Sequence, residues 1–302
     1  MSKPALLIVG HGSRDNDAVS EFTQLVVAFR QQFPERLCDY GFLEFATPLI
    51  SDGLNALIKQ GASKITAIPA MLMAAGHVKN DIPSEINSLQ AQFPNIELQY
   101  GVDLGLHANM LQAAQARIES VEPKTTNYKR EETLLMVVGR GTSDADANSN
   151  ISKVTRMLGE GMGFGWAETS YSGVTTPLLK DALETVANLR FKNIIVFPYF
   201  LFTGRLVKRI YQHTDEFQLQ HADINVIKAP YLNDHQLVLN TFFQRLSETE
   251  SGTGNMNCQL CHYREQIVGS EHKVGMPQQG HHHHVRGIGT DHHDDHHHDH
   301  PD

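Results

Sequence analysis

Features that would define several classes of protein are scarce in this sequence of 302 residues. Three cysteines are too few for a disulfide framework, so we expect a chain from a reducing compartment. No apolar run approaches the roughly 20 residues that cross a bilayer, and the apolar start is too short for a signal peptide. A net charge of −9 argues against nucleic acid as the main partner. The sequence therefore predicts a soluble cytoplasmic protein without nucleic-acid or membrane partners.

What the sequence does contain is an internal repeat with an offset of 129 residues. LLIVGHGSRDND at 6–17 matches LMVVGRGTSDAD at 135–146, and GFLEFATPLI at 41–50 matches SYSGVTTPLL at 170–179. ITAIPAML at 65–72 then matches IIVFPYFL at 194–201, and a one-residue deletion follows. Two copies of one fold have therefore diverged within the chain.

Three polar side chains of the first half are lost together in the second. His11, Glu44 and His77 are replaced, in that order, by Arg140, Gly173 and Arg205. Surface loops that vary freely would explain any one of these changes. The coordinated loss of all three, between matching strands, favours a function for them.

Each half alternates short Val/Ile/Leu-rich runs with amphipathic stretches, which is typical of parallel strands joined by helices. We therefore predict the α/β class, with two duplicated, doubly wound parallel-sheet domains. The polar segment at 121–132 is interpreted as a linker, so the domains are expected at 1–122 and 131–250. Pro48 is expected in the first turn of a helix, and Ser13 is expected to cap another.

His11, Glu44 and His77 each lie at or just beyond the carboxyl end of a predicted strand, the edge where open parallel sheets bind ligands. Two imidazoles and a carboxylate suit Co²⁺, Ni²⁺, Fe²⁺ or Zn²⁺, with coordination positions left open. The first loop lacks the spacing of a dinucleotide fingerprint or a P-loop. A hydrolase with Ser13 as nucleophile is disfavoured because no G-x-S-x-G elbow is present.

The first half resembles the sirohydrochlorin cobaltochelatase family through VGHGSR at 9–14, EFATP at 44–48 and PAMLMAAGHVKNDIP at 69–83. Residues 1–250 resemble its long, two-domain form. The resemblance implies a class II chelatase, which inserts a divalent metal into a tetrapyrrole without nucleotide hydrolysis. It also implies that His11 and His77 bind the metal and accept protons, with Glu44 as their acidic partner.

The implied tetrapyrrole carries many carboxylates, which require cationic or N–H donors. Arg140 and Arg205 are expected to face the cleft from the second half, and Arg14 and Gly76 are the candidates in the first half. The alternative is that Arg140 and Arg205 are surface arginines that bind no ligand.

The function predicted is insertion of Co²⁺ into sirohydrochlorin, in cobalamin biosynthesis. Cobalt is favoured because the long form and the His-rich tail resemble the cobaltochelatase side of the family. Iron insertion for sirohaem is the closest alternative. A non-catalytic metal store or chaperone, and a two-lobed module that binds carboxylate ligands, are the other hypotheses.

Residues 251–302 form a tail of another composition, with 12 of the 18 histidines of the chain. Low apolar content predicts disorder, and imidazole with carboxylate at this density predicts loose binding of Co²⁺, Ni²⁺ or Zn²⁺. A purification tag would explain 281–284, although it does not explain the interleaved Asp and His residues beyond Asp291.

Cys258 and Cys261 form a C-x-x-C pair in this tail, which supplies two of the four ligands that zinc or an iron–sulfur cluster needs. Long members of the family are similar in carrying a Cys-containing redox centre near the C-terminus. The resemblance therefore implies an iron–sulfur cluster at this pair, with zinc or no metal as alternatives. Further ligands could come from Cys38, from His262, or from the same pair of a second subunit. The last of these predicts a homodimer through the tail.

Overall fold

The computed structural model describes residues 3–125 and 127–253, and it contains two four-stranded parallel sheets. The strand order is β2-β1-β3-β4 in the first sheet and β6-β5-β7-β8 in the second. The strands of the first sheet are β1 Lys3–Gly10, β2 Leu37–Phe42, β3 Ala62–Pro69 and β4 Glu97–Tyr100. Those of the second are β5 Thr133–Gly139, β6 Trp166–Tyr171, β7 Asn193–Pro198 and β8 Asn225–Lys228. The predicted α/β class with two duplicated parallel sheets is confirmed.

The central strands are apolar along their whole length because helices cover both faces of each sheet. Every residue from Ala5 to Val9 in β1 and from Leu134 to Val138 in β5 is buried. The strand register repeats with the sequence: Leu6 pairs with Cys38 and Thr66, and Leu135 pairs with Ala167 and Ile195. The two sheets therefore share one register as well as one strand order.

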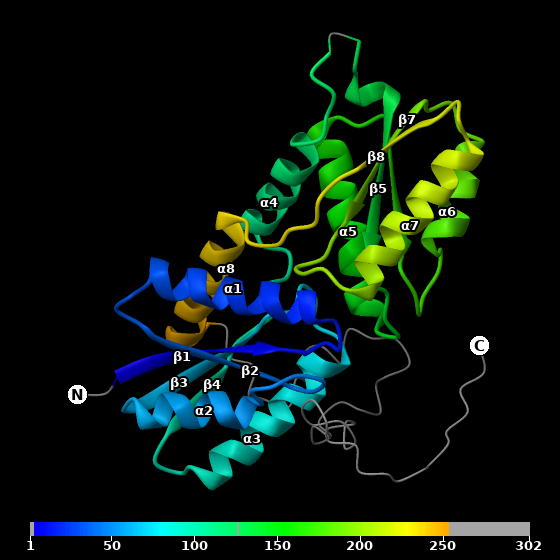
Figure 1. The fold of residues 1–302 in the computed structure, drawn as a ribbon. Helices are drawn as coiled ribbons and strands as arrows, with labels where there is room; N and C mark the ends of the chain where they lie inside the picture. The colour runs from blue at the N-terminus through cyan, green and yellow to red at the C-terminus, as the bar shows by residue number, and fades with distance from the viewer. Residues whose placement is uncertain (1–2, 126, 254–302) are drawn as a thin grey trace, which may run out of the picture.

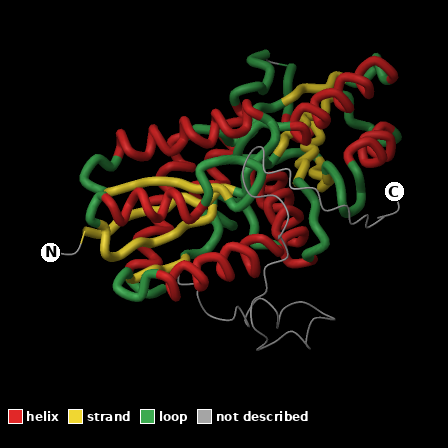
Figure 2. Tube along the Cα trace, turned by 60° about the horizontal axis from the view of Figure 1, so that its bottom comes forward, coloured by secondary structure: helices red, strands yellow, loops and turns green. Residues whose placement is uncertain are grey.

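Eight α-helices lie between and around the strands within the described residues (Figures 1 and 2). They are α1 Asn16–Gln32, α2 Ile50–Lys59, α3 Ile82–Gln92, α4 Ala108–Glu119, α5 Ala145–Met162, α6 Leu179–Ala187, α7 Arg205–Gln220 and α8 Gln236–Glu250. A π-helical turn at His77–Asp81 leads into α3, and a short 3-10 turn spans Arg130–Glu132. None of these helices has both the length and the hydropathy needed to cross a membrane.

The last helix of each repeat packs in the opposite lobe. Helix α8 lies beside α1 and contacts β3 of the first sheet, whereas α4 lies beside α5 of the second lobe (Figure 1). The rings of Phe33, just after α1, and Phe243 in α8 stack with centroids 4.5 Å apart. One apolar core runs continuously through α1, α4, α5 and α8.

The contiguous domains expected at 1–122 and 131–250 stay a prediction, to which this exchange of helices adds contacts between the two segments. The repeat follows these segments in sequence, while α8 packs against β3 of the first sheet and α4 packs beside α5 of the second lobe. Hydrophobic periodicity predicts that α4 and α8 are helices. It does not predict the part of the molecule against which each helix packs.

Two local predictions differ from the structure. Pro48 lies outside helix α2, which begins at Ile50 after the N-cap residue Leu49. Its carbonyl oxygen accepts the N–H of Phe42, the last residue of β2, at 2.8 Å. Asp15, and not Ser13, caps α1, through a hydrogen bond from the N–H of Asp17 at 3.1 Å. The Ser13 hydroxyl instead accepts the N–H of Asp15.

Candidate functional site

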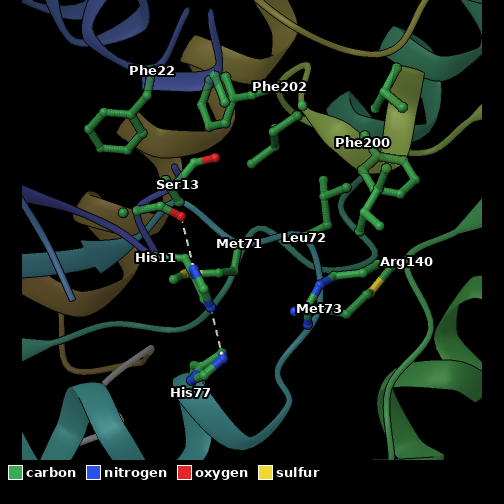
Figure 3. Close-up of a pocket in the computed structure, with 18 of the residues that line it drawn as sticks. His11, Ser13, Phe22, Met71, Leu72, Met73, His77, Arg140, Phe200 and Phe202 are labelled. Atoms are coloured by element: carbon green, nitrogen blue, oxygen red, sulfur yellow. Dashed lines mark hydrogen bonds between the residues drawn. The ribbon is translucent and has the colours of Figure 1, made fainter. Parts of the chain in front are cut away.

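His11, Glu44 and His77 meet at the carboxyl edge of the first sheet, where their loops follow β1, β2 and β3. Figure 3 shows the rings of His11 and His77 next to each other. The Nε2 atoms of His11 and His77 are 2.9 Å apart. The Oε1 atom of Glu44 lies 3.3 Å from the same nitrogen of His11. One potential ligand atom from each residue lies within 4.8 Å of the others, which fits a shared metal ion.

The main chain holds the first two loops together. The carbonyl of His11 accepts the N–H of Glu44 at 3.0 Å. Between them Gly12 adopts a φ of 95°, and a Cβ at this position would lie 1.6 Å from the carbonyl oxygen of Glu44. Only glycine fits such a close approach at a positive φ. The separation of His11 and Glu44 is therefore fixed by the backbone.

The tautomers of the two histidines follow from the partners of their Nδ1 atoms. Nδ1 of His77 is 2.9 Å from a carboxylate oxygen of Asp81, and Nδ1 of His11 is 3.0 Å from the carbonyl oxygen of Gly12. Both acceptors require a proton on Nδ1, which leaves a lone pair on each Nε2. Two lone pairs 2.9 Å apart repel each other unless a cation lies between them. The arrangement therefore suits a proton or a metal ion between the two nitrogens.

Burial strengthens this preference for a cation. Glu44 is only 4% exposed, so its charge is shielded little by water. Its influence reaches the second half, where desolvation lowers the pKa of Arg140 while the negative charge of Glu44 opposes that shift. Arg140, the counterpart of His11, therefore lies within electrostatic reach of the first-half site.

A cavity of about 620 Å³ separates the two lobes in front of the histidines. Apolar side chains after β3 and β7 line it, and Figure 3 labels Met71, Leu72, Met73, Phe200 and Phe202 among them. The volume and the apolar walls suit a ligand of several rings.

Three of the four residues predicted to bind substrate line this cavity: Arg14, Arg140 and Arg205. The guanidinium of Arg14 lies 5.1 Å from the centroid of the Phe45 ring, which itself stacks on His11. Gly76 is the exception, because it is exposed and is not part of the cavity wall. Its φ of −45° is open to any residue, so the structure gives no reason for glycine here.

The corresponding place in the second half keeps the backbone and loses the candidate metal ligands. Gly141 has a φ of 81°, and a Cβ there would lie 1.8 Å from the carbonyl oxygen of Gly173, as at Gly12. The guanidinium of Arg209 lies 3.6 Å from the point where a Cβ of Gly173 would be, and it donates to the carbonyl of Ser172 at 2.7 Å. A cation thus fills the space that Glu44 occupies in the first half.

Two groups near the cleft were not predicted from the sequence. Lys79 is buried and bridges both aspartates of the D-x-D segment at 144–146, and Lys208 bridges both aspartates of the segment at 15–17. The duplicated D-x-D spacing was a usable signal for these contacts between lobes. The contact of Asp81 with His77 had a signal too, since the two residues are four positions apart in a helical segment.

Cys258, Cys261 and the histidines of the tail lie outside the described residues. The cluster and the homodimer inferred from the cysteine pair stay predictions, and the similarities to known proteins lend the cluster no support.

Comparison with known proteins identifies the family to which this chain is similar. The CbiX family model matches residues 5–121 and again 134–249. A sirohydrochlorin cobaltochelatase of Priestia megaterium is 36% identical over 265 residues, which cover 87% of this chain and 86% of that protein. A sirohydrochlorin ferrochelatase of the same organism is 30% identical over 251 residues, which cover 83% and 92%.

Solved structures agree with this result. SirB from Bacillus subtilis with Fe³⁺ has a TM-score of 0.73 and 27% identity, over 84% of this chain and 99% of that one. The sirohydrochlorin chelatase SirB from Bacillus subtilis subspecies spizizenii in complex with cobalt has a TM-score of 0.71 and 28% identity, with the same coverage. The match of both repeats to one family model, and of nearly the whole fold to SirB, shows that this chain belongs to the CbiX family of sirohydrochlorin chelatases.

Proposed function

We propose that this protein inserts Co²⁺ into sirohydrochlorin, as a step of cobalamin biosynthesis. The observation that carries the proposal is the pair of opposed Nε2 atoms of His11 and His77, 2.9 Å apart beside the buried Glu44, on the wall of a large apolar cleft. Cobalt is supported by the 36% identity to a cobaltochelatase, against 30% for a ferrochelatase.

The proposed chemistry exchanges a metal ion for two protons. Sirohydrochlorin must lose two pyrrole N–H protons when a divalent ion enters the ring. As His11 and His77 release the metal, their Nε2 lone pairs become available. Because only one proton fits between nitrogens 2.9 Å apart, the first proton passes on through Glu44 before the second one is taken up. Histidine suits this role because its ordinary pKa of about 6.5 permits both forms near neutral pH. Glu44 steers the cation and stabilises the resulting positive charge.

The opposite wall of the cleft is proposed to hold the macrocycle. Arg140 and Arg205 would bind carboxylates of sirohydrochlorin from the second half, and Arg14 would do so from the first. Met71, Met73 and Phe202 provide apolar surface for the ring. Charge-assisted hydrogen bonds to carboxylates would fix the ring with its centre toward the histidines.

Iron is the second candidate metal, with sirohaem as the eventual product. The 30% identical ferrochelatase and the SirB structure with Fe³⁺ favour it. Residue types alone do not separate the two ions, since His and carboxylate ligands accept both. A metal store or chaperone would draw on the tail, but it leaves the apolar cleft without a purpose.

The test is anaerobic incubation of the protein with sirohydrochlorin and either Co²⁺ or Fe²⁺ at equal concentration. The change in the absorption spectrum of the macrocycle gives initial rates, from which the rate without protein is subtracted. We expect faster insertion of Co²⁺. An equal or higher rate with Fe²⁺ would overturn the assignment of the metal, and no acceleration with either ion would overturn the chelatase proposal.

A further inference from the structure

Asp81 contacts the metal site without being one of its three ligands. Its Oδ2 atom lies 2.9 Å from Nδ1 of His77, and its side chain is about as buried as that of Glu44. Asp81 stands at the N-cap position of α3, yet within the described chain its side chain caps no N–H group of that helix. A role in starting the helix therefore does not account for a carboxylate at this position.

The hydrogen bond from His77 to Asp81 decides which nitrogen of His77 carries the proton. Without this acceptor, His77 could hold its proton on Nε2 and donate it to Nε2 of His11, 2.9 Å away. The two imidazoles would then be joined by a neutral hydrogen bond, which a metal ion would have to break. With Asp81 in place the proton stays on Nδ1, and both Nε2 lone pairs face the cation position.

We propose that Asp81 is a positioning residue that keeps His77 in the tautomer able to bind the metal. This inference rests on the metal site of the proposed function. It adds a fourth residue to His11, Glu44 and His77, one that acts through His77 and does not touch the metal itself.

The second repeat supports this inference independently. The helices after β3 and β7 align through Gln90 and Gln218, each of which accepts an N–H from the next strand, at Leu98 and Val226 respectively. In this alignment the counterpart of Asp81 is Arg209. The carboxylate is thus lost in the half that lost both histidines and Glu44, which is expected of a residue that acts through His77.

The experiment is a titration of the metal-free full chain with Co²⁺ alone, followed by its visible absorption. A His11→Ala/His77→Ala double variant gives the background, including binding by the 12 histidines of the tail. We expect Asp81→Ala to weaken cleft binding by about 10- to 100-fold, the usual effect of removing such a carboxylate. Asp81→Asn should lose less, because its amide oxygen can still accept the Nδ1 proton.

The matched control is Arg209→Ala, the same position in the other repeat, which should keep wild-type affinity for Co²⁺. Nitrogen-15 NMR of the metal-free protein should place the His77 proton on Nδ1 in the wild type and on Nε2 in Asp81→Ala. Wild-type affinity in a folded Asp81→Ala variant would overturn the inference. If that variant does not fold, wild-type affinity in the similarly sized Asp81→Leu variant, which has no acceptor for the Nδ1 proton, would overturn it. If the double histidine variant also binds like the wild type, it is the metal site of the proposed function that fails.

Discussion

The two repeats of this chain have almost the same backbone and opposite chemistry at one position of the fold. Phe45 and its counterpart Val174 both adopt a left-handed φ, of 62° and 67°. The first repeat places two imidazoles and two carboxylates around this frame, whereas the second places arginines there. The frame therefore depends on glycine and main-chain hydrogen bonds, while the site depends on a few side chains that can change without loss of the fold.

The largest effect is expected from removing the histidines. His11→Ala and His77→Ala should each reduce metal insertion to the uncatalysed rate, because in the proposed function each histidine binds the metal and accepts a proton. Their melting temperatures should stay near that of the wild type, since the second repeat folds with arginine at both positions. Glu44→Gln should slow insertion less.

The rates are measured with the absorption assay. His213→Ala, at a site outside the cavity wall, is the control. Wild-type rates in both histidine variants would contradict the assignment.

The difference between the repeats can also be tested by building the candidate metal site of the first repeat into the second repeat. The substitutions are Arg140→His, Gly173→Glu, Arg205→His and Arg209→Asp, made in the His11→Ala/His77→Ala background. Because the backbone frame is already present, we expect Co²⁺ binding to return above that of the background. Keeping Arg209 should weaken the new site by at least about 10-fold, since its guanidinium occupies the space beside Gly173.

Co²⁺ titration measures both grafted proteins against the double histidine variant. A four-residue graft that is folded and binds no more Co²⁺ than its background would show that the two frames differ in a way that the backbone does not reveal.

A smaller effect is expected from the arginines of the second repeat. Arg140→Ala and Arg205→Ala should each weaken sirohydrochlorin binding by roughly 10- to 100-fold, since a charge-assisted hydrogen bond contributes about 1.5–3 kcal/mol. Binding is measured by equilibrium titration of the macrocycle without metal. Arg190→Ala, which lies outside the cavity wall, is the control. If both cleft variants keep wild-type affinity, the two arginines are surface residues.

The smallest effect concerns the tail. A chain that ends after Thr253 keeps the hydrogen bond from its N–H to the carbonyl of Glu248 at the end of α8. We expect this protein to match the wild type at saturating Co²⁺ and to be slower when Co²⁺ is scarce, because the His-rich segment would raise the local metal concentration. Rates over a series of Co²⁺ concentrations test this. A folded, truncated protein that is slow at every concentration would assign the tail a part in the chemical step.

Much of the fold could be predicted from the sequence because it is encoded locally. Continuous apolar runs such as Ala5–Val9 mark central strands, and parallel strands bring the residues that follow them to one edge. The amino-acid sequence alone was therefore enough to place His11, Glu44 and His77 together. The crossing of α4 and α8, the burial of Lys79 and the turn of Asp81 toward His77 depend on contacts between distant segments, which periodicity does not encode.

The crossing of α4 and α8 has a consequence for how such a cleft can evolve. If each sheet needs the last helix of another copy, two separate one-repeat chains would have to intertwine as a twofold-symmetric dimer. In such a dimer every substitution appears twice, so both walls of the cleft must stay identical. Joining the copies into one polypeptide removes that constraint. The two walls of the cleft can then acquire different side chains, while α4 and α8 still hold the two halves together.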